Sequence, residues 1–190
     1  MHRPAAFAAL GLIALAVASA DARPMRVMAD LPEAAGGRYL TSLSSPAIKP
    51  NSDIPRKYVD VSPPLAWKPV PGAASYVVIV EDIDAGDKAA GVPFLHWLAW
   101  NIPYNATSLP EGASGKPGAK FVEGRNGAGK IGYFGPHPPP GRAHRYQFQI
   151  LAISNVVNLP AGASRRDVLK AIRGQAVGHG GFVGFYANPR

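Results

Sequence analysis

Carboxylates at the end of an apolar run are the first side chains in this chain that could do chemistry. Glu81, Asp82 and Asp84 directly follow the apolar run 76–80, and Asp82 has the same parity as Val80. Alternation therefore predicts that the Asp82 carboxylate lies on the face of Val80, at the end of a strand. Such a carboxylate can accept a hydrogen bond from an imidazole or a ligand amine, or it can simply cap a turn.

A histidine within the next apolar run is the second candidate. Strict alternation over residues 94–100 predicts that Phe94, His96, Leu98 and Trp100 share one face of a strand. An imidazole on that face could donate a hydrogen bond to a ligand oxygen. A lone histidine among apolar neighbours is more often a satisfied core residue, so the structural role stays open.

A stiff proline segment is the third feature. Residues 132–146 read GYFGPHPPPGRAHRY, and the consecutive prolines after His137 can form neither a helix nor a central strand. The three prolines 138–140 are therefore predicted to form an extended wall whose shape is fixed before any ligand binds, which lowers the entropy cost of binding. The structural alternative is a Pro-rich turn between two strands.

Polar donors follow that wall. Alternation predicts that His144 and Tyr146 point to the same side of a strand, whereas Arg145 points away and braces the structure. An imidazole and a phenol beside a rigid wall suit a phosphate, sulfate or carboxylate group, because each can donate to an anionic oxygen.

Several short strands must position these side chains. The run 76–80 predicts a strand buried on both faces, and residues 94–100 and 146–152 alternate like strands with two different faces. Ser164 and Asp167 have the spacing of a capping box, which predicts one late helix. This pattern indicates a mainly β fold, a β-sandwich with a peripheral helix.

Composition and charge narrow the function classes. The chain has 21 glycines and 20 prolines in 190 residues, which disfavours a mostly helical protein. It has no cysteine, which excludes disulfides, thiol nucleophiles and thiolate metal ligands. The net charge is +8, and the excess lies within residues 116–190, which favours an anionic ligand or partner there. A basic surface that only aids solubility is the alternative.

The N-terminal residues have the pattern of an export signal. Arg3 precedes an apolar run that ends in small residues around Ala20, as in a secretory signal peptide with an A-x-A-like cleavage site. We expect residues 1–22 to be removed and residues 23–190 to form a single domain, periplasmic or secreted. An uncleaved anchor is the alternative. No other apolar stretch is long enough to predict a transmembrane segment.

The chain lacks the complete motifs of several other functional classes. Residues 124–131, GRNGAGKI, nearly match a nucleotide-binding P-loop, but Ile131 stands where the magnesium-binding hydroxyl is required. The chain has no G-x-S-x-G serine-hydrolase elbow. The histidines are not spaced as metal ligands, so we predict no metal and no cofactor. No basic helix or RNA-binding signature supports a nucleic-acid partner.

Taken together, the segments resemble the phosphatidylethanolamine-binding protein family, in its bacterial Raf kinase inhibitor-like branch. The matching stretches are SPPLAW (62–67), VEDIDA (80–85), FLHWLAWNIP (94–103), LPEG (109–112), GRNGAGKIGYFGPHPPPGRAHRY (124–146) and LPAGASRRDVLKAIRG (159–174). This resemblance implies an antiparallel β-sandwich with short peripheral helices and a small anion pocket for phosphoryl or similar head groups. Two prolines of the family's D-P-D-x-P motif are replaced here, by Ile83 and Gly86, which implies a less rigid pocket edge.

The resemblance implies which residues bind the ligand, and no catalytic residue is predicted. They are Asp82, His96, Pro138, Pro139, His144 and Tyr146. The expected function is an exported protein that binds a small anion such as a phosphate-like group or a phospholipid head group. Two alternatives remain: an inhibitor or regulator of a protease or kinase-like protein partner, and a weak hydrolase or lyase that uses the Asp–His pocket.

Overall fold

Two β-sheets face each other across a shared core. The computed structural model describes residues 25–28, 34 and 39–189, so the predicted signal peptide, residues 1–22, lies outside the described part. The large sheet has the order β1 (Tyr39–Leu40), β10 (Ala176–Tyr186), β9 (His144–Ile153), β5 (Ser75–Asp87), β6 (Val92–Pro103) and β8 (Val122–Glu123), with β3 (Ser52–Asp53) also paired to β10. The small sheet contains β2 (Leu43–Ser44), β4 (Leu65–Trp67) and β7 (Ser108–Leu109).

The central strands of the large sheet are antiparallel. The neighbours β10 and β9, β9 and β5, β5 and β6, and β6 and β8 all pair antiparallel, and only the short strands β1 and β3 pair with β10 in parallel. A short 3₁₀ helix, η2 (Arg56–Val59), precedes β4. The predicted antiparallel β-sandwich with short peripheral helices is therefore confirmed.

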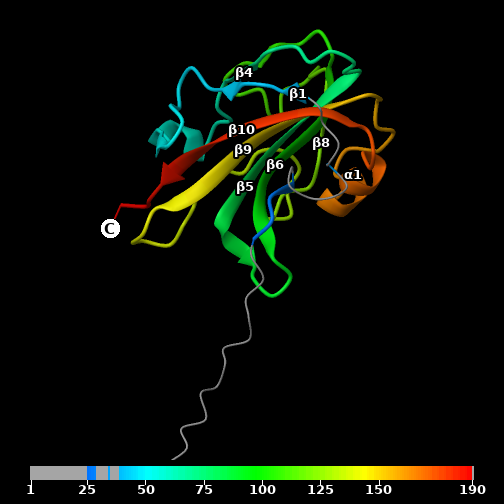
Figure 1. Ribbon diagram of the computed structural model, residues 1–190. Helices are drawn as coiled ribbons and strands as arrows, with labels where there is room; N and C mark the ends of the chain where they lie inside the picture. The colour runs from blue at the N-terminus through cyan, green and yellow to red at the C-terminus, as the bar shows by residue number, and fades with distance from the viewer. Residues whose placement is uncertain (1–24, 29–33, 35–38, 190) are drawn as a thin grey trace, which may run out of the picture.

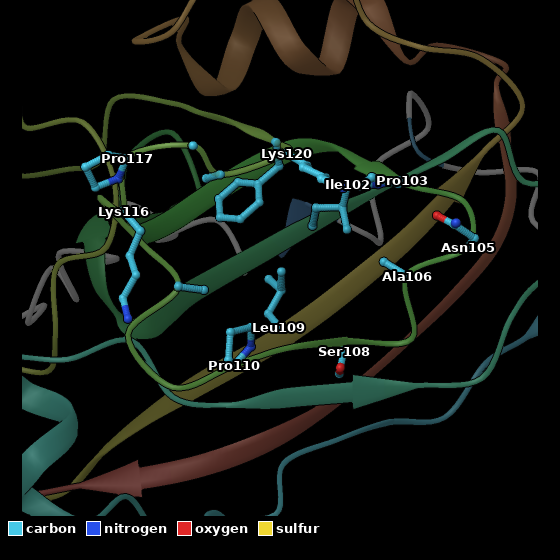
Figure 2. A pocket seen from close by; sticks show the side chains of 14 residues that line it. Ile102, Pro103, Asn105, Ala106, Ser108, Leu109, Pro110, Lys116, Pro117 and Lys120 are labelled. Atoms are coloured by element: carbon cyan, nitrogen blue, oxygen red, sulfur yellow. The ribbon is translucent and has the colours of Figure 1, made fainter.

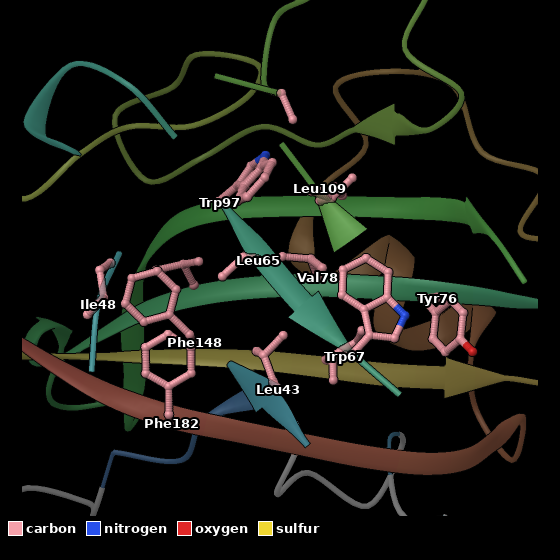
Figure 3. Packing of buried hydrophobic residues seen from close by; sticks show 14 of the residues in the cluster. Leu43, Ile48, Leu65, Trp67, Tyr76, Val78, Trp97, Leu109, Phe148 and Phe182 are labelled. Carbon is pink, nitrogen blue, oxygen red and sulfur yellow. The ribbon is translucent and has the colours of Figure 1, made fainter. Parts of the chain in front are cut away.

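The main core lies between the two sheets. Leu43, Leu65 and Leu109 of the small sheet pack against side chains of the large sheet such as Val78 and Phe148 (Figure 3). These residues are at most 5% exposed, so the inner faces of both sheets are removed from water. Burial of this apolar surface fixes the large sheet as the platform on which the polar residues at its ends are placed.

A second core lies under the helix α1 (Arg165–Ala171), on the other side of the large sheet (Figure 1). The Ser164 side chain accepts from the Asp167 backbone N–H, and the Asp167 side chain accepts from the Ser164 N–H, so the predicted capping box is confirmed. Val168 of α1 and Ile172, which directly follows the helix, are fully buried in this cluster. Together with Leu151 of β9, they seal the second face of the sheet.

A bulge in β6 changes the predicted face of two side chains. Between β5 and β6 the pairing steps from Trp97 to Leu95 while β5 advances by one residue, which leaves His96 as an extra residue. Leu98 and Trp100 therefore lie in the cluster under the helix, whereas His96 lies on the opposite face. The prediction that these three side chains share one face is wrong, because strict alternation holds only where no bulge interrupts the strand.

Strand β10 was not predicted from the sequence, because its Gly-rich stretch has low β-propensity. Its glycines are required by close packing. A Cβ on Gly180 would collide with the carbonyl oxygen of Thr41, where the chain crosses from β1 to β2. In the residues that the structure describes, no helix is long and apolar enough to cross a membrane.

Candidate functional site

A small cavity of about 170 Å³ opens at one end of the large sheet, beside β5, β6 and β9. Its lining residues are Asp82, Ala85, Phe94, His96, Phe134, His137, Pro138, Pro139, His144 and Tyr146. All six residues singled out from the sequence line this one cavity. Ala85, Phe94, Phe134 and His137 are the additional lining residues.

Asp82 and His144 form a hydrogen-bonded pair at the centre of the cavity wall. Asp82 on β5 is opposite Tyr146 on β9, and this register brings the carboxylate beside His144, two residues earlier on β9. The His144 Nδ1–H donates to Asp82 Oδ2 over 2.7 Å. This bond fixes the orientation of the ring and leaves Nε2 as the free ring nitrogen.

The other oxygen of the same carboxylate shapes the rim. Asp82 Oδ1 accepts from the backbone N–H groups of Asp84 and Ala85 at 2.8 and 3.1 Å. The pairing of β5 with β6 skips from Asp82 to Gly86 at this point, so the intervening residues loop out of the sheet. Gly86 has φ 119°, a conformation that favours glycine, and a Cβ there would collide with the Val92 carbonyl oxygen.

Asp84, the neighbouring acidic residue, forms ion pairs with two arginines. Asp84 accepts from Arg145 Nε at 3.0 Å and Nη2 at 2.8 Å, and from Arg142 Nη2 at 3.2 Å. The Arg145 guanidinium lowers the pKa of Asp84 to about 2, so the carboxylate stays charged. Arg145 thus points away from the cavity and braces its edge. These contacts hold the rim segment that contains Ile83 and Gly86.

His96 is buried against an aromatic neighbour. It is 3% exposed, and its Nδ1–H donates to the Phe134 carbonyl oxygen over 2.6 Å. Burial lowers the pKa of His96, so the ring is neutral at neutral pH and its Nε2 carries no hydrogen. The expectation that His96 donates to ligand oxygens is therefore wrong, because its one ring hydrogen is held by a backbone carbonyl. Its Nε2 can accept a hydrogen bond instead.

Tyr146 places a phenol among these groups. It is 1% exposed and packs edge-on against the His96 ring, with ring centroids 5.1 Å apart. Its hydroxyl lies near the Asp82 carboxylate without meeting the distance and angle of a hydrogen bond to any described residue. Burial and then the charge of Asp82 raise its pKa, so the phenol keeps its proton and remains a donor.

Hydrogen bonds and ring stacking hold the proline wall in place. The Pro138 carbonyl oxygen accepts from Asn188 Nδ2, and His137 Nδ1–H donates to the Gly135 carbonyl over 2.9 Å. The His137 ring stacks on Phe134 at a centroid distance of 4.9 Å. Strand alternation could not predict this stacking, because Phe134 and His137 lie in an irregular segment.

Glu81 is next to Asp82 in the chain, but its side chain lies on the opposite face of the large sheet. It is fully buried and accepts from Arg165 Nε at 2.8 Å, from Gln149 Nε2 at 2.8 Å and from the Met28 N–H at 2.7 Å. Its role is structural, since it links α1 and the N-terminal segment to the sheet. Across residues 25–28, 34 and 39–189, no cluster of three or more His, Cys, Asp or Glu side chains could hold a metal ion.

Comparison with known proteins identifies the same fold and sequence pattern. The pattern of the phosphatidylethanolamine-binding protein family matches residues 44–187. A UPF0098 protein of Methanothermobacter thermautotrophicus is 38% identical over 152 residues, which cover 76% of this chain and 97% of that protein.

Two crystal structures resemble the chain along almost their whole length. CT736 from Chlamydia trachomatis, a homologue of phosphatidylethanolamine-binding protein, has a TM-score of 0.70 and 31% identity, covering 78% of this chain and 98% of its own. YbcL from E. coli has a TM-score of 0.71 and 28% identity, covering 79% of this chain and 99% of its own. The chain belongs to the phosphatidylethanolamine-binding protein family.

Proposed function

We propose that the protein binds a small anionic ligand, a phosphate-like group or a phospholipid head group, in the cavity at the end of β5, β6 and β9. The observation that carries the proposal is the bond between His144 Nδ1 and Asp82 Oδ2. This bond holds the imidazole in place and orients its Nε2 as the ring's remaining hydrogen-bonding atom. A protonated His144 would present a charged donor to an anion.

The other polar atoms of the cavity complement a phosphoryl group that carries one proton. The Tyr146 hydroxyl is a donor that lies near the Asp82 carboxylate and forms no hydrogen bond with the described residues, and His96 Nε2 is an acceptor. A hydrogen phosphate or its monoester offers both oxygen acceptors and one O–H donor, so it can satisfy both atoms. Pro138 and Pro139 bound the cavity with a fixed wall, which reduces the ordering cost of binding.

The size of the cavity limits the ligand. About 170 Å³ is below the roughly 300–1,000 Å³ of pockets that enclose drug-sized molecules. We therefore expect only the head group to be enclosed, with any larger substituent left outside.

Calorimetric titration with phosphoethanolamine tests this proposal. Removal of a charge-assisted hydrogen bond costs about 1.5–3 kcal/mol, so His144→Ala should weaken binding by roughly ten- to a hundredfold. The matched control is Lys170→Ala, at an exposed position of α1 that does not line the cavity, which should change the affinity little. Equal affinity of wild type and His144→Ala, with both proteins folded, would contradict the proposal.

An acid–base enzyme is the second candidate, because the same Asp82–His144 pair could move a proton. None of the residues that line the cavity is a serine, threonine, cysteine or lysine, so attack on a bound phosphoester would fall to a histidine or to a water activated by the Asp82–His144 pair. Incubation with a panel of phosphoesters decides between the two. Product formation that His144→Ala abolishes would replace the binding function with an enzymatic one.

We also propose that the protein is exported. The support is the order of Arg3, the apolar run and the small residues around Ala20. An exported protein without cysteine depends on its core for stability, and the two buried clusters on either side of the large sheet provide it.

A further inference from the structure

A second concave site lies at the opposite end of β6 from the anion cavity. It has a volume of about 370 Å³, within the range of ligand pockets. Its lining residues are Ile102, Pro103, Asn105, Ala106, Ser108, Leu109, Pro110, Ala113, Lys116, Pro117, Gly118, Ala119, Lys120 and Phe121. We call it the β6–β7 groove, since it lies around the end of β6 and the strand β7 (Figure 2).

The floor of this groove is hydrocarbon that belongs to the main core. Ile102 is fully buried, Leu109 and Ala113 are 5% exposed, and Phe121 packs against the same cluster. Pro103, Pro110 and Pro117 add rigid apolar walls. A core whose edge opens into a concave apolar surface offers contact area to an apolar ligand.

The charge of the groove has one sign. Lys116 and Lys120 are exposed lining residues, and no lining residue is acidic. Neither lysine forms an ion pair within the described part of the chain, and the nearby carboxylate of Glu111 is bound to Lys57 and Tyr58. Figure 2 shows Lys116 extending along one end of the groove, between Pro117 and Pro110. A carboxylate at that end would meet an unpaired ammonium group.

We infer that the β6–β7 groove binds a single-chain amphiphile with a carboxylate head, a fatty acid, with its alkyl chain on the apolar floor and its head at the two lysines. A flexible alkyl chain needs no hydrogen-bond partner along its length. A peptide would bring amide groups that need hydrogen-bond partners, and the floor side chains of Ile102, Leu109, Ala113 and Phe121 offer none. Polar lining side chains are confined to Asn105, Ser108 and the two lysines. On β6 the nearest lining residues of the two sites, His96 and Ile102, are six residues apart, roughly 20 Å, so this ligand site is independent of the proposed function.

The experiment measures the binding of decanoate to the full chain, at concentrations below the critical micelle concentration. Decanol is the control ligand, because it has the same chain length and no charge. Wild type should bind decanoate more tightly than decanol. Lys116→Ala combined with Lys120→Ala should weaken decanoate binding by about two- to twentyfold and leave decanol unchanged. Lys49→Ala combined with Lys88→Ala is the matched control, because it removes the same charge from exposed positions outside the groove.

A second variant tests the floor without disturbing the core. Ser108 is an exposed lining residue, so Ser108→Trp should fill the groove and reduce binding of both ligands at least tenfold. Ser42→Trp, at an exposed position that does not line the groove, should bind like wild type. Phosphoethanolamine affinity should be the same in all these variants, and His144→Ala should bind decanoate normally, so failure of one site is distinguishable from failure of the other.

Three results would overturn the inference. One is no saturable binding of decanoate, and another is unchanged affinity in both the double-lysine variant and Ser108→Trp. The third is tighter binding of an acidic apolar peptide than of decanoate, with the peptide binding lost in Ser108→Trp. That result would assign the groove to a protein partner.

Discussion

Asp82 on β5 and His144 on β9 are 62 residues apart in the chain, and their side chains meet across the end of the large sheet at 2.7 Å. One Asp82 oxygen is used by His144, and the other by the backbone of the adjacent rim. Asp82 therefore orients the imidazole, and its side chain also lines the cavity. The predictions below follow from this arrangement and from the contacts around it.

The first prediction concerns anion binding by two histidines of the cavity. Calorimetric titration with inorganic phosphate should show that His144→Ala weakens binding roughly tenfold or more, because the variant removes the ring that Asp82 orients. His96→Gln should have a smaller effect, because burial lowers the pKa of His96 and its neutral ring keeps its one hydrogen on the Phe134 carbonyl. A phosphate affinity that His96→Gln lowers more than His144→Ala does would contradict the role given to His144.

The second prediction concerns the His96 tautomer. Because Nδ1–H is bound to the Phe134 carbonyl and burial lowers the pKa of His96, the ring should be the neutral Nδ1–H form at pH 7. Histidine ring ¹⁵N NMR measures this directly, with Nε2 resonating as an unprotonated nitrogen. Assignment is made by loss of the signal in His96→Gln. An Nε2–H tautomer or an imidazolium at pH 7 would show that the ring is held differently.

The third prediction concerns acid stability. The pKa of Asp84 is about 2 in the folded protein and near 3.9 in an unfolded chain, so its bond to Arg145 stabilises fully above about pH 5. The stabilisation is lost as the pH falls toward 2. Since Arg145 is half exposed, we expect about 1–2 kcal/mol after solvent screening.

Urea unfolding of wild type and Asp84→Asn measures this contribution. The variant should be less stable at pH 7, and the difference should shrink at pH 2.5. Asp60→Asn is the matched control, since Asp60 is exposed and makes no ion pair within the described residues. A difference between wild type and Asp84→Asn that does not depend on pH would show that the substitution acts through packing.

The fourth prediction concerns export. If the N-terminal segment is a signal peptide that is cleaved after Ala20 or Ala22, the mature protein should begin at Asp21 or Arg23. Intact-mass measurement of protein expressed from its full sequence and recovered from the exported fraction gives the answer. Retention of residues 1–20 would contradict cleavage.

Much of the fold followed from sequence features that act locally. The capping box at Ser164 predicted the start of α1, and alternation over residues 146–152 predicted the two faces of β9. Alternation failed in β6 because the bulge at His96 is set by pairing with β5, which no pattern within β6 reveals. Strand β10 was missed because its glycines are explained only by a crossing segment, as at Gly180.

The candidate site was predictable to a similar extent. Asp82 and His144 could be placed at strand ends by parity, and Pro138 and Pro139 by the rigidity of consecutive prolines. Charge states could not be predicted in this way. The neutral state of His96 depends on a carbonyl supplied by Phe134, 38 residues further along the chain, and on burial by the folded protein.

A crystal structure of the protein with phosphoethanolamine tests the central claim most directly. The phosphoryl group should lie in the cavity with one oxygen at about 2.6–3.1 Å from His144 Nε2 and another within hydrogen-bond distance of the Tyr146 hydroxyl. The Asp82–His144 bond should be retained, and the same soak of His144→Ala crystals should leave the cavity without the ligand. A phosphoryl group bound elsewhere on the protein, or bound in this cavity equally well in the variant, would contradict the assignment of the site.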